Sequence, residues 1–133
     1  PLNLDIARRA ITDYADSQAA PEPTDVERVV GNYLGVTRDA ICGKSRDRTT
    51  SLARALTAFL VRKHTSMSFP EIGRALGNKN HTTILMAVRR VEKTLRQEGA
   101  VTWMTSSGLR EVRLRDVLQT LEQDLTPIRR PPA

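Results

Sequence analysis

The side chains best suited to recognise a ligand are Asn80-His81-Thr82-Thr83, at the start of a segment with helical periodicity. Histidine and threonine hydrogen-bond to base edges in the DNA major groove, and the threonine methyl contacts the thymine methyl. Short side chains allow the backbone to come close to the bases, and a helix N-terminus directs N–H groups and a positive dipole end toward phosphates. DNA reading and simple helix capping are both compatible with this pattern, and the pattern alone leaves the two open.

The basic charge of the chain is concentrated in its middle. The formal net charge is +6 and the sequence pI is about 10.2. Residues 44–63 carry six basic residues and one acid, and residues 71–97 carry six basic residues and two acids. A basic block inside a foldable domain is typical of a protein that binds the phosphate backbone, although a solvated helical surface is the alternative. Acidic membranes are a weaker fit, because no amphipathic segment has the bulky apolar face that membrane binding needs.

Several function classes are excluded by residue types. Cys42 is the single cysteine, so no internal disulfide is expected, and its distance in sequence from His64 and His81 disfavours a structural zinc site. No glycine-rich phosphate loop and no Ser–His–acid or Cys–His set is present, so we predict no catalysis, no metal and no cofactor in this chain. No apolar run reaches the length of a membrane span. A reducing, cytoplasmic location fits the single cysteine.

The elements that must position Asn80–Thr83 have the layout of a helix-turn-helix unit. Ser68-Phe69-Pro70-Glu71 is a capping box with proline in the first turn, and it predicts a helix that Gly77 ends. A second helix is predicted from His81 to about Gln97. Its buried stripe is Ile84, Val88, Val91 and Leu95.

Further helices are predicted on both sides of this unit. A helix near residues 2–14 and a linker around residues 19–23 come first, and Thr24-x-x-Glu27 is interpreted as a capping box for a helix that Gly35 ends. Thr37 caps a short turn through Ile41, a loop follows, and a long helix is expected from about residue 50 to His64. After Gly99, residues 101–114 are compatible with a β-hairpin or with a loop entering a helix. Leucines at helical spacing predict a final helix over 114–125, and residues 128–133 resemble a frayed tail.

Trp103 lies in the segment after Gly99. It is expected either to pack in the core or to mark a partner surface, and the sequence does not choose between the two.

The motif Ser68-Phe69-Pro70-Glu71-Ile72-Gly73 … Leu76-Gly77-Asn78-Lys79-Asn80-His81-Thr82-Thr83-Ile84 closely resembles the signature of the DNA-binding domain of the bacterial chromosomal replication initiator family, DnaA. The resemblance extends from about Thr24 to Gln97. It implies an all-α, Trp-repressor-like helix-turn-helix bundle. The segment after Gly99 departs from the family, and a small β-hairpin near residues 101–114 is one of the two alternatives given above for it. Residues 1–20 are similar to the last helix of that family's AAA+ lid, plus a linker. The resulting expectation is a lid-like segment at 1–20, a DNA-binding domain at 24–98 and a C-terminal extension at 99–133.

The resemblance also implies residue roles. His81, Thr82 and Thr83 match the base-reading positions, and Asn80 stands where the family usually has Asp, so it keeps the capping oxygen and adds a donor. Arg46 matches the arginine that enters the adjacent minor groove, where narrow A·T-rich DNA attracts guanidinium. Asp47 is expected to weaken this loop slightly. DNA-backbone contacts are expected from Lys44, Arg48, Arg54, Arg62 and Lys79, with plain solvation as the alternative for Lys44, Arg48 and Lys79.

The function implied by the resemblance is sequence-specific binding of double-stranded DNA at DnaA-box-like origin sites during initiation of chromosome replication. The alternative is a stand-alone helix-turn-helix regulator without an ATPase. Double-stranded DNA is the expected partner, other initiator subunits are further candidates, and a monomer suits an asymmetric site. ATP is expected only in an upstream AAA+ domain, and Pro1 in place of Met suggests that such a segment was cut away.

Overall fold

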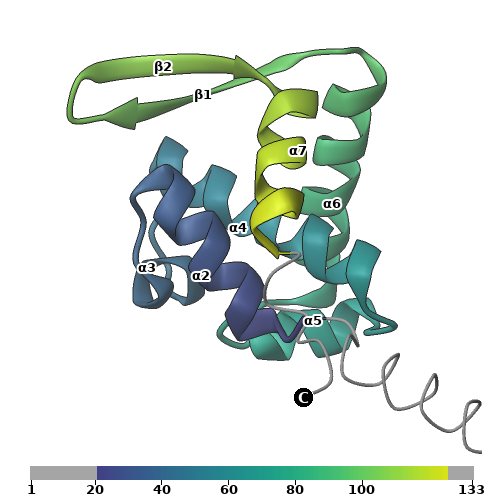
Figure 1. The fold of residues 1–133 in the computed structure, drawn as a ribbon. Helices are drawn as coiled ribbons and strands as arrows, with labels where there is room; N and C mark the ends of the chain where they lie inside the picture. The colour runs from purple at the N-terminus through teal and green to yellow at the C-terminus, as the bar shows by residue number, and fades with distance from the viewer. Residues whose placement is uncertain (1–20, 126–133) are drawn as a thin grey trace, which may run out of the picture.

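The computed structural model describes residues 21–125. In chain order its elements are α2 (Pro23–Leu34), α3 (Arg38–Cys42), α4 (Arg48–His64), α5 (Phe69–Ala75), α6 (His81–Arg96), β1 (Ala100–Thr105), β2 (Gly108–Arg113) and α7 (Leu114–Leu125). The described part is therefore mostly helical, with one antiparallel hairpin, as expected. Figure 1 shows the hairpin reaching from the ends of α6 and α7 toward the side of the molecule where α2 and α3 lie. The helix expected near residues 2–14 and the tail at 128–133 lie outside the described residues.

The long helix α4 is the centre of the core. It packs against both α2 and α6. Ala53, Leu56, Ala58, Leu60 and Val61 are almost completely buried, whereas Leu52 and Phe59 are only partly buried. Small alanine side chains allow neighbouring helices to approach from several directions, so α4 is buried over more than one face.

The segment after Gly99 is a hairpin rather than a loop. Trp103 of β1 lies opposite Arg110 of β2. The Trp103 side chain is 1% exposed, and its ring centroid lies 5.5 Å from that of Tyr33 on α2. Trp103 therefore packs in the core. The predicted final helix is confirmed as α7, and its leucines join the same core cluster as the helix-turn-helix residues.

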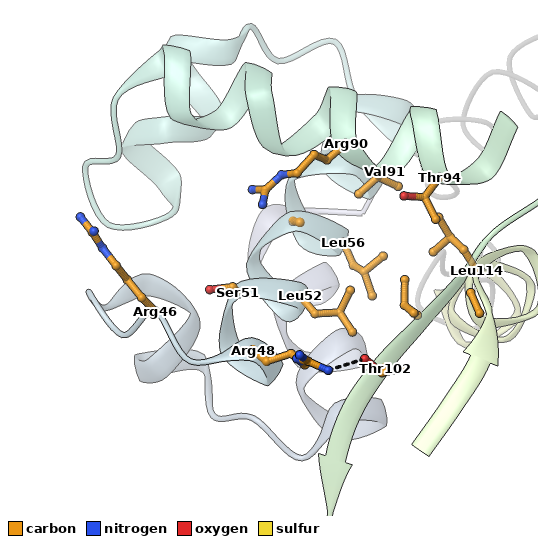
Figure 2. Close-up of a pocket in the computed structure, with 13 residues that line it drawn as sticks. Arg46, Arg48, Ser51, Leu52, Leu56, Arg90, Val91, Thr94, Thr102 and Leu114 are labelled. Atoms are coloured by element: carbon orange, nitrogen blue, oxygen red, sulfur yellow. Dashed lines mark hydrogen bonds between the residues drawn. The ribbon is translucent and has the colours of Figure 1, made fainter. Parts of the chain in front are cut away.

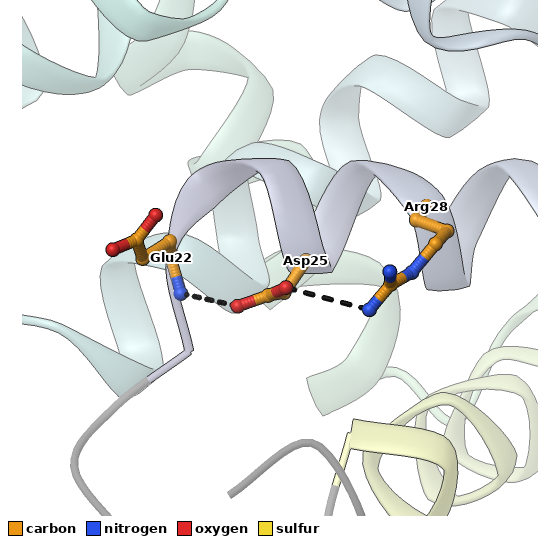
Figure 3. Close-up of polar contacts among 3 residues, drawn as sticks. All are labelled: Glu22, Asp25 and Arg28. Atoms are coloured by element: carbon orange, nitrogen blue, oxygen red, sulfur yellow. Dashed lines mark hydrogen bonds and ion pairs between the residues drawn. The ribbon is translucent and has the colours of Figure 1, made fainter.

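Two helix starts differ from the sequence prediction. The Thr24-x-x-Glu27 capping box is wrong: Glu22 is the N-cap of α2, and Pro23 takes the first helical position, where proline is well tolerated. The Glu22 N–H donates to Asp25 at 3.0 Å, and Arg28 pairs with the same carboxylate at 3.4 Å (Figure 3).

Helix α4 begins at Arg48, ahead of the expected position, because Asp47 caps it. The Asp47 carboxylate accepts the Thr50 N–H at 2.9 Å. The other predicted helix caps and helix ends are confirmed. Thr37 caps α3, Ser68 and Glu71 form a reciprocal capping box, and Gly35 ends α2 with a φ of 74°.

Candidate nucleic-acid interface

The turn between α5 and α6 is packed directly onto α5. The Lys79 N–H donates to the Gly73 carbonyl at 2.8 Å. A Cβ on Gly73 would lie 2.2 Å from the Lys79 carbonyl oxygen, so only glycine allows this approach. Gly77 and Asn78 follow one another in the left-handed region, with φ of 88° and 60°. This close packing fixes the direction in which α6 leaves the turn.

The N-terminal turn of α6 is an exposed polar tip on a helix whose other face is anchored. Asn80 caps the helix by accepting the Thr82 N–H at 2.8 Å. His81, Thr82 and Thr83 are all exposed, and their side chains have no hydrogen-bond partner among the described residues. The buried residues behind the tip are Ile84, Ala87, Val88 and Val91. Of the predicted stripe, Leu95 is only partly buried.

The basic loop between α3 and α4, residues 43–47, is held by Arg54. Its guanidinium donates to the carbonyls of Ile41 at 2.8 Å, Ser45 at 3.0 Å, and both Ala40 and Gly43 at 3.1 Å. Because these carbonyls include the C-terminal end of α3, the cation also lies where the helix dipole favours positive charge. Most of the Arg54 donors are therefore engaged within the protein, and contact with a DNA phosphate stays a prediction.

Lys79 connects the basic loop to the helix-turn-helix. Its ammonium group donates to the Cys42 carbonyl at 3.1 Å and to the Gly43 carbonyl. Burial, and then the neighbouring Arg54 charge, lower the pKa of Lys79. A Cβ on Gly77 would lie 2.0 Å from the Cys42 carbonyl oxygen, so the two backbones are in direct contact. The basic loop and the turn between α5 and α6 are therefore packed together as one unit.

Two further predicted contact residues have internal partners but remain exposed. Arg62 donates to the Met67 carbonyl at 2.9 Å and lies 4.3 Å from the centre of the Phe69 ring. Arg48 donates to the Thr102 hydroxyl on β1 at 2.9 Å. Each of these guanidiniums keeps further N–H donors that these bonds do not use.

Arg46 and Lys44 are different, because they are exposed with no hydrogen bond or ion pair to the described residues. Next to Arg46, Asp47 has a structural role that the sequence did not predict, and its effect on DNA binding by the loop stays a prediction. The Ser45 hydroxyl and then the Thr50 N–H lower the pKa of Asp47 to about 2. Asp47 therefore stays charged and organises both the loop and the start of α4.

Sequence reasoning missed a groove between α4, α6 and the hairpin. It has a volume of about 460 Å³. Arg46, Arg48 and Arg90 line it together with Thr102 (Figure 2). The sequence does not predict that Arg90 of α6 and Thr102 of β1 line the same groove, because β1 comes beside α4 only in the folded protein.

The comparisons with known proteins cover the same region. Residues 23–91 match the family model described as the bacterial dnaA protein helix-turn-helix. The chain belongs to the DnaA family.

Similar proteins carry the name chromosomal replication initiator protein DnaA. The one from Corynebacterium jeikeium is 36% identical over 103 residues, which cover 76% of this chain and 18% of that protein. The one from Bifidobacterium animalis is 31% identical over 98 residues, 74% of this chain and 17% of that protein. The one from Thermus thermophilus is 32% identical over 93 residues, 69% of this chain and 21% of that protein. The chain therefore spans about a fifth of these relatives.

The DnaA assignment fixes the kind of domain. A DnaA helix-turn-helix is a DNA-binding unit and not a catalytic one. The hairpin and α7 lie after residue 91, where the match to the family model ends. Within residues 21–125, no helix combines the length and apolar character needed to cross a membrane. No group of three or more His, Cys, Asp or Glu in that range is arranged to hold a metal ion.

Proposed function

We propose that this chain recognises DnaA-box-like sites, which are short, asymmetric and A·T-rich, in double-stranded DNA during initiation of chromosome replication. The tip of α6 enters the major groove, and the basic loop carries Arg46 into the adjacent minor groove. One observation carries the proposal: the Asn80–Thr83 tip and Arg46 are both exposed and free of side-chain partners other than the Asn80 cap, on two segments that Lys79 joins through its bonds to the Cys42 and Gly43 carbonyls.

The base-reading roles follow from donors and shape. His81, Thr82 and Thr83 read base edges, and the amide of Asn80 adds a donor beside its capping oxygen. Arg46 is drawn to the negative potential of a narrow A·T-rich minor groove.

The other cations contribute in two ways. Lys44, Arg48 and Arg62 bind phosphates, and these contacts give salt-dependent affinity. Arg54 acts mainly by holding the loop against α4, and Lys79 by joining the loop to the turn between α5 and α6, because their donors are directed at main-chain carbonyls. We further propose that the domain binds as a monomer in the bacterial cytoplasm, since an asymmetric site does not require a two-fold protein. Other initiator subunits are further candidate partners.

The test is an anisotropy titration of the chain against a DnaA-box duplex and a scrambled duplex of equal composition, over a series of salt concentrations. We expect tighter binding to the box at every salt concentration. His81→Ala should reduce the difference between the two duplexes by about 1–3 kcal/mol. Gln119→Ala, at an exposed position on α7, is the matched control and should leave the difference unchanged. Equal affinity of the unmodified chain for both duplexes contradicts the proposal.

A further inference from the structure

The groove beside the hairpin lies where a DNA strand must pass. Adjacent major and minor grooves of a duplex are separated by one sugar–phosphate strand. If the α6 tip occupies one groove and Arg46 the next, that strand crosses the protein between α6 and the basic loop. The groove defined above, hereafter the hairpin groove, has walls from both of these segments and from β1.

The hairpin groove has the charge of an anion site. Its polar lining comprises the three arginines Arg46, Arg48 and Arg90 and the hydroxyls of Ser51, Thr94 and Thr102. None of the described residues that line it is acidic. The remaining lining is apolar, from residues such as Leu52 and Leu56. Low-dielectric walls that carry one sign of charge focus the potential and attract the opposite charge.

Arg90 belongs to the same face of α6 as the reading tip. It follows Thr83 by seven residues, which is close to two helical turns and about 10 Å along the axis. Arg90 is exposed and has no hydrogen-bond or ion-pair partner among the described residues. In Figure 2 its side chain extends along α6 toward the end of the groove where Arg46 lies.

The hairpin supplies the opposite wall and orients Arg48. The Thr102 hydroxyl accepts from the Arg48 guanidinium at 2.9 Å, as Figure 2 shows. Two residues further along β1, the Met104 N–H donates to the Thr49 hydroxyl at 3.1 Å. These two bonds attach β1 to the first turn of α4. Because an exposed arginine otherwise samples many rotamers, the bond to Thr102 holds the Arg48 guanidinium in one place.

We propose that the hairpin groove binds the DNA strand that separates the two grooves read by this domain. Arg90 and Arg48 bind its phosphodiester oxygens, and Thr102 is a positioning residue for Arg48. This inference rests on the proposed function, because the location of that strand follows from the two reading elements.

Neutralising individual phosphates tests the contact directly. The protein is titrated against box duplexes that carry a single methylphosphonate, placed in turn along the backbone. Arg90→Ala should weaken box and scrambled binding alike, roughly three- to tenfold, and reduce the salt slope by about 0.9. The same variant should lose its sensitivity to methylphosphonates on the strand between the two grooves and keep it elsewhere. Arg96→Ala, which removes the same charge from α6 outside the groove, should behave as the unmodified chain.

Variants at Thr102 test the positioning role of the hairpin. Thr102→Val removes the acceptor and keeps the side-chain shape, and Thr102→Ser restores the hydroxyl. We expect the valine variant to lose affinity for both duplexes with an unchanged melting temperature, and the serine variant to recover it. In an Arg48→Ala background the valine substitution should have no further effect.

If Arg90→Ala lowers the melting temperature of the protein, the phosphate experiment is done with Arg90→Gln, which keeps most of the side-chain stem.

Two outcomes overturn the inference: an unchanged salt slope and unchanged methylphosphonate profile for the Arg90 variants, or a Thr102→Val effect that adds fully to that of Arg48→Ala. Failure of the proposed function is a separate result. In that case the unmodified chain does not distinguish the box from the scrambled duplex, whatever the Arg90 variants do.

Discussion

Replacing Arg54 with methionine separates two roles that a cation of a DNA-binding domain can have. Methionine keeps an unbranched apolar stem and removes every donor of the guanidinium. The structure directs four of those donors at carbonyls of Ala40, Ile41, Gly43 and Ser45. We therefore expect Arg54→Met to loosen the loop that carries Arg46 and to act on DNA binding through that loop.

The magnitude follows from the four bonds. A hydrogen bond to a charged group contributes about 1.5–3 kcal/mol, but the carbonyls near the surface regain water when the donor is lost. Three of the four bonds are part-buried and the one to Ser45 is exposed. We expect the free energy of unfolding to fall by about 2–4 kcal/mol, which lowers the melting temperature by about 8–20 °C.

Thermal unfolding followed by circular dichroism measures the stability change. Box-binding titrations over a salt series measure the change in DNA binding. If Arg54 acts through the loop, Arg54→Met should add little to Arg46→Ala, because both remove the same minor-groove contact. Arg96→Met, at an exposed arginine without a hydrogen-bond partner among the described residues, is the control and should change neither quantity appreciably.

The reasoning is refuted by one combination of results. An Arg54→Met variant with the original melting temperature, a salt slope reduced by about 0.9 and effects additive with Arg46→Ala would identify Arg54 as a direct phosphate ligand.

Three further predictions concern the scaffold that holds the interface. Gly77→Ala should unfold more easily than Gly35→Ala, because both positions have positive φ but only a Cβ on Gly77 would collide with backbone. In a denaturant titration, the free energy of unfolding should fall by about 1 kcal/mol for Gly35→Ala and clearly more for Gly77→Ala. Trp103→Ala should cost about 3–5 kcal/mol, measured in the same way, since the ring is 1% exposed; a loss below 1 kcal/mol would contradict its place in the core. The Asp47 carboxylate, with its pKa lowered to about 2, stabilises the fold above the unfolded pKa, and this contribution is lost as the pH falls through about 2. Melting temperatures of the unmodified chain should therefore fall more steeply below about pH 4 than those of Asp47→Asn, and parallel curves would show that Asp47 has no such role.

Local signals predicted the recognition unit well. A capping box, a glycine stop and an Asn cap are properties of a few consecutive residues, and Ser68, Gly77 and Asn80 occupy those positions in the structure. The start of α2 was misplaced because two capping patterns overlap there, and proline at the first position selects the earlier one. The capping role of Asp47 was missed because it depends on where α4 begins, and the sequence placed that start near residue 50.

The amino-acid sequence by itself determined the polar tip of α6, the basic middle of the chain and the helical periodicity around them, since each depends on neighbours within a turn or two. The tertiary structure alone decided which cations are exposed and which hold the loop. Arg54 and Lys79 resemble Arg46 and Lys44 in sequence, yet the first pair meets main-chain carbonyls 9 to 37 residues away and the second pair meets solvent. It also decided that β1 comes beside α4, which joins Thr102 to Arg48 across 54 residues. Such pairings depend on packing the whole core, and no short window of sequence contains the information that specifies them.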